Sequence, residues 1–444
     1  MLDFLHSLVW GIPTAALLCA AGAFLLVKIK FLPLIRPLYV TKRTFGRLFS
    51  RREGVSPFAA MATALGGTIG TGNIVGVATA LTLGGAGAIF WMWISAVPGM
   101  ATKYAEVFLA VKHRRPDGEG GFKGGPMYVI THGMGSGFRP LAAIFSVLCI
   151  AASFGIGNTV QINSAADALN GSFGLNRTAV GAAAAIIVLI CASGGTKRIA
   201  GLAGVLVPFM AALYIAGSLA AVGGHMGRIP GALGEIVSGA FGLRPAAGGI
   251  AGFGLAAAVR AGVSRGIFTN EAGMGSAPIA HASAASTPHE QGCWGIMEVF
   301  IDTIVVCTLT ALVILTSDVW QSGTLPDGAR LTSAAFAESL GGWSEAFLAV
   351  AVSLFAFASV LGWSHYGKTA VRFLWVRPAA GRVYMALFAA AMIAGANIAM
   401  GTVWAAADIL NGLMIFVNML PVIMLSGELD CAGGTRPKKK HIAK

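Results

Sequence analysis

Residues 64–115 read ALGGTIGTGNIVGVATALTLGGAGAIFWMWISAVPGMATKYAEVFLAVKHRR, and this stretch decides the fold of the chain. It is apolar enough to cross a bilayer twice, with a turn near Gly84 and Gly85, but glycines interrupt its first pass. Each glycine costs a helix about 1 kcal/mol relative to alanine. Irregular backbone inside a membrane is tolerated only where it is buried in protein or lines a cavity. The stretch therefore predicts a broken membrane helix at a binding site.

The composition is that of a helical membrane protein with several spans. The chain has 444 residues, of which 56% are hydrophobic and 11% charged, and its mean hydropathy is +0.76. A soluble domain carries about a quarter charged residues. The net charge of +13 is clustered in particular loops, as the positive-inside rule describes, which argues against a nucleic-acid partner. The six cysteines show no metal-binding spacing and no disulfide framework.

Eleven transmembrane helices are predicted from the apolar runs. The first, Leu8–Val27, is expected to be retained, since no basic region precedes it as in a signal peptide. The basic loop after it is expected in the cytoplasm, which places the N-terminus outside the inner (plasma) membrane and the C-terminus in the cytoplasm. Lys and Arg then fall on the cytoplasmic side except for Arg177, Arg228, Arg244 and Arg330, and for Lys103 within a span. The other ten spans are 57–83, 86–111, 140–168, 178–195, 199–222, 248–268, 294–316, 343–366, 383–400 and 402–426.

The ten later spans are predicted to form two repeats of five helices. The expected parts are an extra N-terminal helix (1–28), a basic cytoplasmic loop (29–56), a first repeat (57–223), an external loop with a helix (224–247), a second repeat (248–427) and a basic tail (428–444). Short external helices at 229–241 and 331–340 could serve as lids. The second repeat opens with a glycine interruption at Gly252, Phe253 and Gly254, as the first opens with GTGN. Corresponding breaks in two halves indicate an inverted-repeat transporter with a site near the membrane midplane.

A broken helix has the chemistry for binding an ion and a zwitterion. The break exposes carbonyl groups at one helix end and N–H groups at the next, with partial charges of about −0.5 and +0.5. Carbonyl groups suit a dehydrated Na⁺, and the N–H end suits a carboxylate. The spacing of Gly70, Gly72 and Gly76 also matches a dinucleotide-binding pattern, but that motif requires a preceding strand and a βαβ unit. A membrane span provides neither.

Residues 66–114 resemble the alanine or glycine:cation symporter family, also called sodium:alanine symporters, through GTGNIVGVATAL, GGAGAIFWMW and GMATKYAEVFLAVKHR. IGTGN followed by GGAGAIF also resembles the first broken helix of leucine-transporter-type symporters, which carries VGLGN and then GGGAF. The resemblance implies a leucine-transporter-like fold. It also implies a Na⁺ site made by the carbonyl groups of Gly66 and Ile69 and the hydroxyl groups of Ser353 and Ser359.

The same resemblance implies a substrate site beside the first break. Thr71 and Gly72 would meet the substrate carboxylate. Asn73 would supply an oxygen to a cation or a hydrogen bond to the substrate, and a helix cap is the alternative role for this asparagine.

Two side chains from other spans are predicted to contact the substrate. Gln161, in GNTVQINS, shares a helix face with Asn158 and Ser164 and can bind an ammonium or carboxylate group without adding buried charge. Its alternative role is a hydrogen bond between helices. Trp363, in a GW-x-x-YG pattern similar to that of the family, could form an aromatic wall of the pocket. The alternative is a tryptophan of the interfacial belt.

Four polar residues are predicted to form an inner gate. Arg260, Arg265, Asn270 and Glu271 belong to a block, ending in FTNEAGMG at residues 268–275, that closely matches the family pattern. Two arginines beside an asparagine and a glutamate at the cytoplasmic edge indicate a hydrogen-bonded gate, and a structural salt bridge is the alternative.

Ionisable residues within apolar spans are functional candidates because burying them costs several kcal/mol. Asp302 is the candidate for cation coupling, whereas Glu298 could lie near the cytoplasmic end, and Asp408 occupies another span. Lys103 and Glu106 lie one helical turn apart and are predicted to pair at the inner interface.

The predicted function is the import of alanine or glycine by symport with Na⁺ through alternating access. The chain has no HExxH or paired-cysteine motif, so an enzyme is not expected. The expected partners are a small neutral amino acid, Na⁺ and the lipid bilayer, with no cofactor beyond the transported ion and with a monomer as one option. A proton-coupled carrier or exchanger and, from another class, an ion channel are the alternatives.

Overall fold

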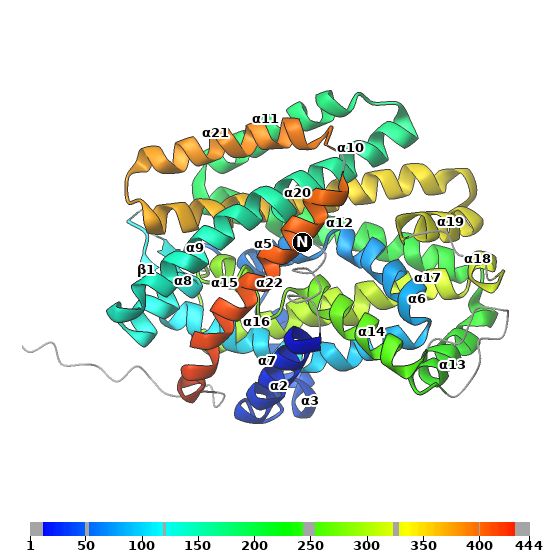
Figure 1. Ribbon diagram of the computed structural model, residues 1–444, viewed down its shortest axis with the longest axis horizontal. Helices are drawn as coiled ribbons and strands as arrows, with labels where there is room; N and C mark the ends of the chain where they lie inside the picture. Colours follow the sequence, from blue (N-terminus) through cyan, green and yellow to red (C-terminus); the bar gives the residue numbers. More distant parts are fainter. Residues whose placement is uncertain are drawn as a thin grey trace, which may run out of the picture.

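The structure, a computed structural model, describes residues 12–48, 53–118, 121–242, 254–322, 328–398 and 400–430. This part of the chain is helical apart from connecting turns and a small antiparallel pair of strands, β1 (Arg115–Pro116) and β2 (Phe122–Lys123) (Figure 1). The helices of the first half are α2 (Ile12–Lys28), α3 (Leu32–Ile35), α4 (Pro37–Thr44), α5 (Pro57–Thr68), α6 (Val77–Gly84), α7 (Gly87–Lys112), α8 (Pro126–Val129), α9 (Arg139–Phe154), α10 (Val160–Phe173), α11 (Arg177–Ser193), α12 (Gly195–Gly223) and α13 (Ile229–Ala240).

The second half continues in the same style. Its helices are α14 (Leu255–Asn270), α15 (Ala277–His281), α16 (Pro288–Val299), α17 (Thr308–Leu315), α18 (Asp318–Gln321), α19 (Gly328–Leu340), α20 (Ser344–Leu374), α21 (Pro378–Gly395) and α22 (Met400–Met424). Four π-helical segments join or end helices: η2 (Gly72–Gly76), η3 (Ile130–Met134), η5 (Gly155–Thr159) and η7 (Phe300–Cys307).

Local sequence explains where several helices begin. The Ser56 hydroxyl accepts a hydrogen bond from the Ala59 N–H at 3.1 Å, and Pro57 follows it as the first residue of α5. Asn176 caps α11 and Thr287 caps α16 in the same way. Such side chains satisfy N–H groups that have no partner inside the helix, and proline fits the first turn because it has no N–H group.

The described helices have the lengths and composition of membrane spans. Six are long and apolar enough to cross a bilayer, and α5 with η2 and α6 forms a seventh candidate that is bent by 55°. Large apolar side chains such as Ile186, Val205, Phe209 and Leu387 are exposed on the outer faces of α11, α12 and α21. A soluble protein rarely exposes so much apolar surface, whereas lipid tails cover it readily. The all-α membrane fold is confirmed, and the count of eleven spans stays a prediction.

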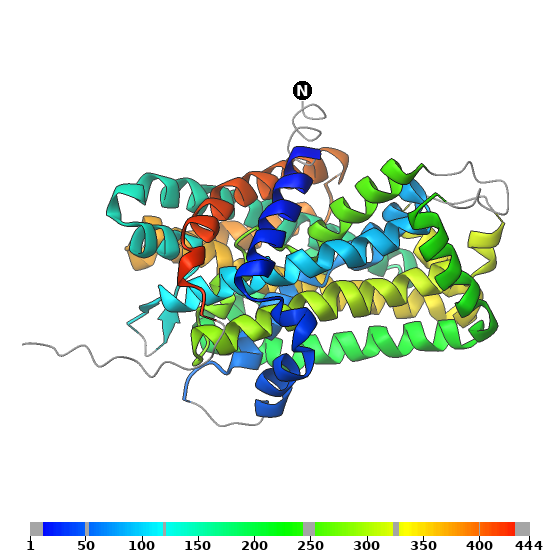
Figure 2. The same ribbon diagram turned by 90° about the horizontal axis from the view of Figure 1, so that it is seen from below.

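Two broken helices run antiparallel at the centre of the molecule. The first is α5 followed by η2 and α6, and the second is α14 followed by α15. Because α6 packs along α14 while α5 packs against α15, the two breaks lie side by side (Figures 1 and 2). They approach closely: a Cβ atom added to Gly72 would lie 3.4 Å from the Thr269 Cγ2 atom.

The second break lies later in the sequence than predicted. Gly252 and Phe253 lie outside the described residues, and Gly254 is the exposed residue that precedes the first turn of α14. The break follows α14, because Glu271, Gly273 and Gly275 have φ values of 52°, 92° and 82°. These left-handed conformations are incompatible with a continuing α-helix. Within the described residues, the glycines of NEAGMG therefore interrupt the second helix, and a break at Gly252 and Phe253 stays a prediction.

The other predicted segments have mixed outcomes. The helices predicted at 229–241 and 331–340 occur as α13 and α19. A role for them as lids is not tested by the structure. The predicted start of the second repeat falls in residues 243–253, and the basic tail falls in residues 431–444, so both lie outside the described part.

Candidate substrate and ion site

A pocket opens between the two breaks, with about 350 Å³ of empty space including its open mouth. Both broken helices, α10 and α20 contribute to its walls. The pocket is lined by Gly67, Thr68, Gly70, Thr71, Gly72, Ile156, Gln161, Phe268, Thr269, Glu271 and Trp363. Thr71, Gly72, Gln161 and Trp363 are thus brought together, as predicted for substrate contacts. Phe268, Thr269 and Glu271 join them from the second broken helix.

Asn73 lies behind the pocket wall and stabilises the first break through hydrogen bonds. Its Oδ1 atom accepts the Gly70 N–H at 3.0 Å, and its Nδ2 group donates to the Asp302 carboxylate at 2.7 Å. The side chain is fully buried and is not part of the pocket wall. Asn73 therefore ties the residue before the restarted helix to Asp302 and does not cap that helix, and its contact with substrate or cation stays a prediction.

Asp302 joins the first break to two neighbouring helices. Besides the bond from Asn73, its Oδ2 atom accepts from the Thr303 hydroxyl at 3.0 Å. That hydroxyl in turn accepts from the Asn270 Nδ2 group at 3.2 Å. Asp302 is completely buried behind the pocket. Its polar partners explain how a carboxylate is accommodated at this depth.

Asn73 and Asp302 both lie in π-helical segments, η2 and η7. A third segment, η5, precedes Gln161. π-Helical turns are rare in proteins, and those that occur are frequently found at functional sites. They shift side chains out of the regular helical position. Three of them beside one pocket indicate that the backbone there is shaped for binding.

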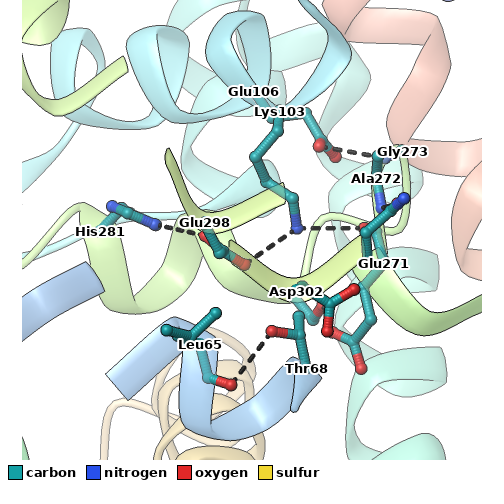
Figure 3. Close-up of polar contacts among 12 residues, drawn as sticks. Leu65, Thr68, Lys103, Glu106, Glu271, Ala272, Gly273, His281, Glu298 and Asp302 are labelled. Atoms are coloured by element: carbon teal, nitrogen blue, oxygen red, sulfur yellow. Dashed lines mark hydrogen bonds and ion pairs between the residues drawn. The ribbon is translucent and has the colours of Figure 1, made fainter. Parts of the chain in front are cut away.

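Lys103 holds the backbone of the second break. Its Nζ atom donates to the Glu271 carbonyl oxygen at 3.3 Å and lies 3.3 Å from a Glu298 carboxylate oxygen (Figure 3). The other Glu298 oxygen lies 2.8 Å from the His281 Nε2 atom. The His281 Nδ1 atom is 2.7 Å from the Gln291 amide nitrogen. The network thus links both sides of the second break through α7 and α16.

The predicted pairing of Lys103 with Glu106 at an interface is wrong. Lys103 pairs with Glu298, and both side chains are fully buried. The Glu106 carboxylate instead accepts from the Gly273 N–H at 3.0 Å and from the Asn418 side chain at 2.5 Å. Lys103 and Glu106 therefore hold two different parts of the same break. Glu298 is shielded from water, and its predicted position near the cytoplasmic end of a span stays a prediction.

Gln161 faces the first break with an unsatisfied group. A Cβ atom added to Gly70 would lie 3.5 Å from its Oε1 atom. That oxygen is buried and has no hydrogen-bond partner in the described part of the chain. Its helix neighbours have other roles: Asn158 donates to the Phe388 carbonyl at 2.7 Å, and Ser164 donates to its own helix. Of the three residues predicted to share a face, Gln161 therefore faces the pocket, whereas Asn158 and Ser164 form structural hydrogen bonds.

Trp363, from α20, closes one side of the pocket. It is 1% exposed and contacts Gly157 so closely that an added Cβ atom would lie 2.3 Å from the Trp363 Cγ atom. A belt tryptophan would be half exposed at a helix end. The structure instead places Trp363 in the pocket wall, with glycine required opposite it.

The residues suggested for a Na⁺ site are partly assembled. The Ser359 hydroxyl donates to the Gly66 carbonyl at 2.9 Å, which joins α20 to the end of α5. Ile69 is buried and ends α5 in an extended conformation. The Ser353 hydroxyl, by contrast, donates to the Ala349 carbonyl of its own helix at 2.6 Å. No contact in the described residues links Ser353 to the first break.

The four residues predicted as an inner gate do not form one cluster. Arg260 is exposed. Arg265 lies 5.7 Å from the centre of the Phe268 ring and interacts electrostatically with Asp408. Asn270 and Glu271 lie at the break itself. Within the described residues no ion pair joins either arginine to Glu271, and a role of these four residues as a gate stays a prediction.

Sequence reasoning missed several residues of the site. Thr68, Ile156, Phe268 and Thr269 line the pocket, but none carries a charge. Phe268 and Thr269 belong to the FTNEAGMG block, in which only Asn270 and Glu271 were chosen as candidates. Lys103 was noticed but assigned the wrong partner. The signal for the second break was present in the alternating glycines of NEAGMG directly after a predicted helix.

Two antiparallel broken helices around a small polar pocket define a secondary transporter of the leucine-transporter fold. Solved structures share this architecture. MhsT in complex with L-phenylalanine matches 85% of this chain and 90% of its own, with a TM-score of 0.58 and 15% identity. A manganese transporter from Eremococcus coleocola matches 84% of this chain and 79% of its own, with a TM-score of 0.57 and 15% identity. At these identities the likeness shows the fold alone.

The chain belongs to the sodium:alanine symporter family, which it matches over residues 1–432. The sodium/alanine symporter AgcS of Methanococcus maripaludis is 41% identical over 438 residues, or 96% of this chain and 94% of the relative. The probable sodium/glutamine symporter GlnT of Bacillus subtilis is 39% identical over 440 residues, or 98% and 90% of the two chains. The protein is therefore a multi-pass membrane transporter and not an enzyme, as predicted.

Proposed function

We propose that this transporter carries alanine or glycine together with Na⁺ by alternating access. The observation that supports this function best is the pairing of two helix breaks around one pocket. A break supplies both carbonyl and N–H groups without a charged side chain. A zwitterion and a cation can use these groups at the same time.

The substrate carboxylate is assigned to the first break. Thr71 and Gly72 line the pocket at the start of the restarted helix, where N–H groups lack partners in the preceding turn. The positive end of the helix dipole favours an anion there. The pocket is closed on another side by Trp363, which leaves little room for a long side chain. A small neutral amino acid fits this arrangement.

The cation is assigned to the end of α5. Oxygen atoms of Gly66, Ile69 and Ser359 would provide a neutral set of ligands, which is the type of ligand that hard cations prefer. Ser359 already contacts the Gly66 carbonyl. Asp302 is a proposed coupling residue because its carboxylate is bonded to Asn73 of the same break. If the cation binds more tightly to the conformation that also binds substrate, cation binding increases the population of that conformation, as linkage requires.

The names of relatives agree with this proposal. The names sodium/alanine symporter for AgcS and probable sodium/glutamine symporter for GlnT both combine a sodium ion with a neutral amino acid. The two names differ in the amino acid, so the choice of alanine or glycine rests on the size of the pocket in this chain.

The test is uptake of labelled alanine by the purified protein in proteoliposomes. An inward Na⁺ gradient should drive accumulation that saturates with alanine and is inhibited by glycine. Replacing external Na⁺ with K⁺ or choline should abolish it. Accumulation driven by a pH gradient without Na⁺ would reject Na⁺ coupling and favour the proton-coupled alternative. Flux that does not saturate with substrate would favour a channel.

A further inference from the structure

Glu271 is an ionisable side chain in the wall of a pocket that is otherwise neutral. It is the first residue after α14, and it takes a left-handed conformation that residues other than glycine adopt rarely. The backbone of Glu271 is fixed because its carbonyl oxygen accepts a hydrogen bond from Lys103. Lys103 forms its ion pair with Glu298 and none with the Glu271 carboxyl group, on which its charge acts only through space.

The carboxyl group of Glu271 has fewer partners than the three other buried acidic groups around the breaks. Glu298 is paired with Lys103 and His281, Asp302 accepts from Asn73 and Thr303, and Glu106 accepts from Gly273 and Asn418. Within the described part of the chain, the Glu271 carboxyl group has a hydrogen bond from Ser276 and no ion pair. Lys103 acts on this carboxyl group only through space, and a buried carboxylate without an ion-pair partner is costly. The pocket therefore offers a position where a cationic group could pair with Glu271.

A second acceptor faces the same pocket from α10. The Oε1 atom of Gln161 is buried without a partner, and the residue is 6% exposed. Two acceptors from different helices, one of them a carboxylate, are suited to a cationic group that carries several N–H donors. An α-ammonium group has three such donors. The carboxylate of the same substrate is already assigned to the first break.

We propose that Glu271 and Gln161 form the ammonium subsite of the transporter, with Glu271 supplying the counter-charge. This inference rests on the proposed function, since it places the amino group of the proposed substrate. It also defines the substrate class more sharply. Molecules must carry both a carboxylate and an ammonium group, so alanine is accepted, whereas lactate and propionate, which lack the ammonium group, are not.

The test compares alanine with lactate in the wild type and in Glu271→Gln. The purified proteins are reconstituted, and competition against labelled alanine is measured at saturating Na⁺. Loss of a hydrogen bond to a charged group should raise the alanine half-saturation concentration about 10- to 100-fold. Lactate should inhibit only weakly in both proteins, and its inhibition constant should not rise in Glu271→Gln because lactate has no ammonium group. The inhibition constant of lactate divided by that of alanine should therefore fall by about the same factor.

Controls separate this subsite from misfolding and from the cation site. Glu345→Gln removes an exposed carboxylate at the start of α20 and should leave both constants unchanged. Gln161→Ala tests the second acceptor and should also reduce the preference for alanine over lactate, even if Glu271→Gln fails to fold. The half-saturation concentration of Na⁺ is measured for each variant.

Three outcomes would overturn the subsite. They are an unchanged alanine constant in a folded Glu271→Gln protein, an equal loss for alanine and lactate, and a rise confined to the Na⁺ constant. The last would assign Glu271 to the co-transported cation instead. Absence of Na⁺-dependent alanine uptake in the wild type would reject the proposed function itself, which is a distinct result.

Discussion

The Nζ atom of Lys103 lies 3.3 Å from a carboxylate oxygen of Glu298, and both side chains are completely buried (Figure 3). The same ammonium group binds the Glu271 carbonyl at the second break. A lysine buried among helices is accommodated only when its charge is balanced. Here the balancing carboxylate lies on α16, and the lysine thereby fixes the irregular backbone against two neighbouring helices.

Lys103→Met should strongly destabilise the protein because it leaves the Glu298 carboxylate buried without its lysine partner. Breaking such a pair costs about 3–5 kcal/mol. The melting temperature of the detergent-solubilised protein should fall, and alanine uptake should be lost. Combining Lys103→Met with Glu298→Gln should restore part of the stability, because the uncompensated charge is then removed. Lys197→Met, at an exposed position on α12, is the control. Equal melting temperatures of wild type and Lys103→Met would disprove the role of the pair.

Asn73→Ala should reduce alanine uptake at least about tenfold, because it leaves the Gly70 N–H without its partner and removes the Asn73 hydrogen bond to the Asp302 carboxylate. Each unsatisfied buried group costs about 1–3 kcal/mol. Initial rates in proteoliposomes measure the effect. Asn170→Ala, which removes an exposed hydrogen bond to the Leu175 carbonyl, should transport normally. Wild-type rates in a correctly folded Asn73→Ala protein would mean that the break needs no such brace.

Ser359→Ala should raise the half-saturation concentration of Na⁺ because the lost hydroxyl is a proposed ligand beside the Gly66 carbonyl. We expect about a tenfold rise, typical of one hydrogen-bond-sized contribution. Ser353→Ala is a closely matched control, since its hydroxyl bonds only within its own helix in the described structure. If the two variants show the same Na⁺ dependence, Ser359 is not part of the cation site.

Gly157→Ala should impair transport by pushing Trp363 into the pocket, since the new methyl group would lie 2.3 Å from the indole. Overpacking of this kind costs about 1–3 kcal/mol. Alanine uptake should fall more than glycine uptake because alanine needs the space of one further methyl group. Gly201→Ala, on α12 with open space around it, should have no such effect. Equal losses for the two substrates would show that Trp363 does not limit the size of the pocket.

Acid should weaken the attachment of the C-terminal segment to the end of α7. The Glu428 carboxylate lies 3.0 Å from Lys112 and 2.8 Å from His113. Partial burial alone would raise the pKa of Glu428, but the hydrogen bonds and positive charge of Lys112 and His113 outweigh it and lower this pKa below its ordinary value. A lowered pKa stabilises the fold above the ordinary carboxyl pKa, and this contribution disappears as pH falls through the folded value. Because the groups are partly exposed, the effect should not exceed about 1 kcal/mol.

Glu428→Gln should remove this acid-dependent loss of stability, as measured by thermal unfolding at neutral and acidic pH. An acid-dependent loss of the same size in Glu428→Gln would contradict this assignment.

The first break could be predicted from sequence because its cause is local. Gly66, Gly67, Gly70, Gly72 and Gly76 disfavour a helix wherever they occur, and an apolar run around them indicates a membrane. The class of protein followed from that combination together with the family resemblance.

The second break and its supports depend on contacts that are distant in sequence. Glycines occur both before α14 and after it in the sequence. The left-handed conformations of Gly273 and Gly275, next to the hydrogen bonds with Lys103 and Glu106 of α7, show the interruption after α14. Lys103 has an acidic neighbour one turn away, so local spacing favours Glu106 over the true partner Glu298 on α16. The position of Glu271 in the pocket wall could not be predicted either, because sequence spacing does not give the depth of a residue in the folded bundle.

The most direct test of the central claim is an experimental structure of the protein determined with Na⁺ and alanine. We predict density for alanine between Thr71 and Gly72 on the first break and Thr269 and Glu271 on the second, with an ion beside Gly66 and Ser359. An unbroken helix through residues 69–76, or alanine bound away from both breaks, would contradict the account.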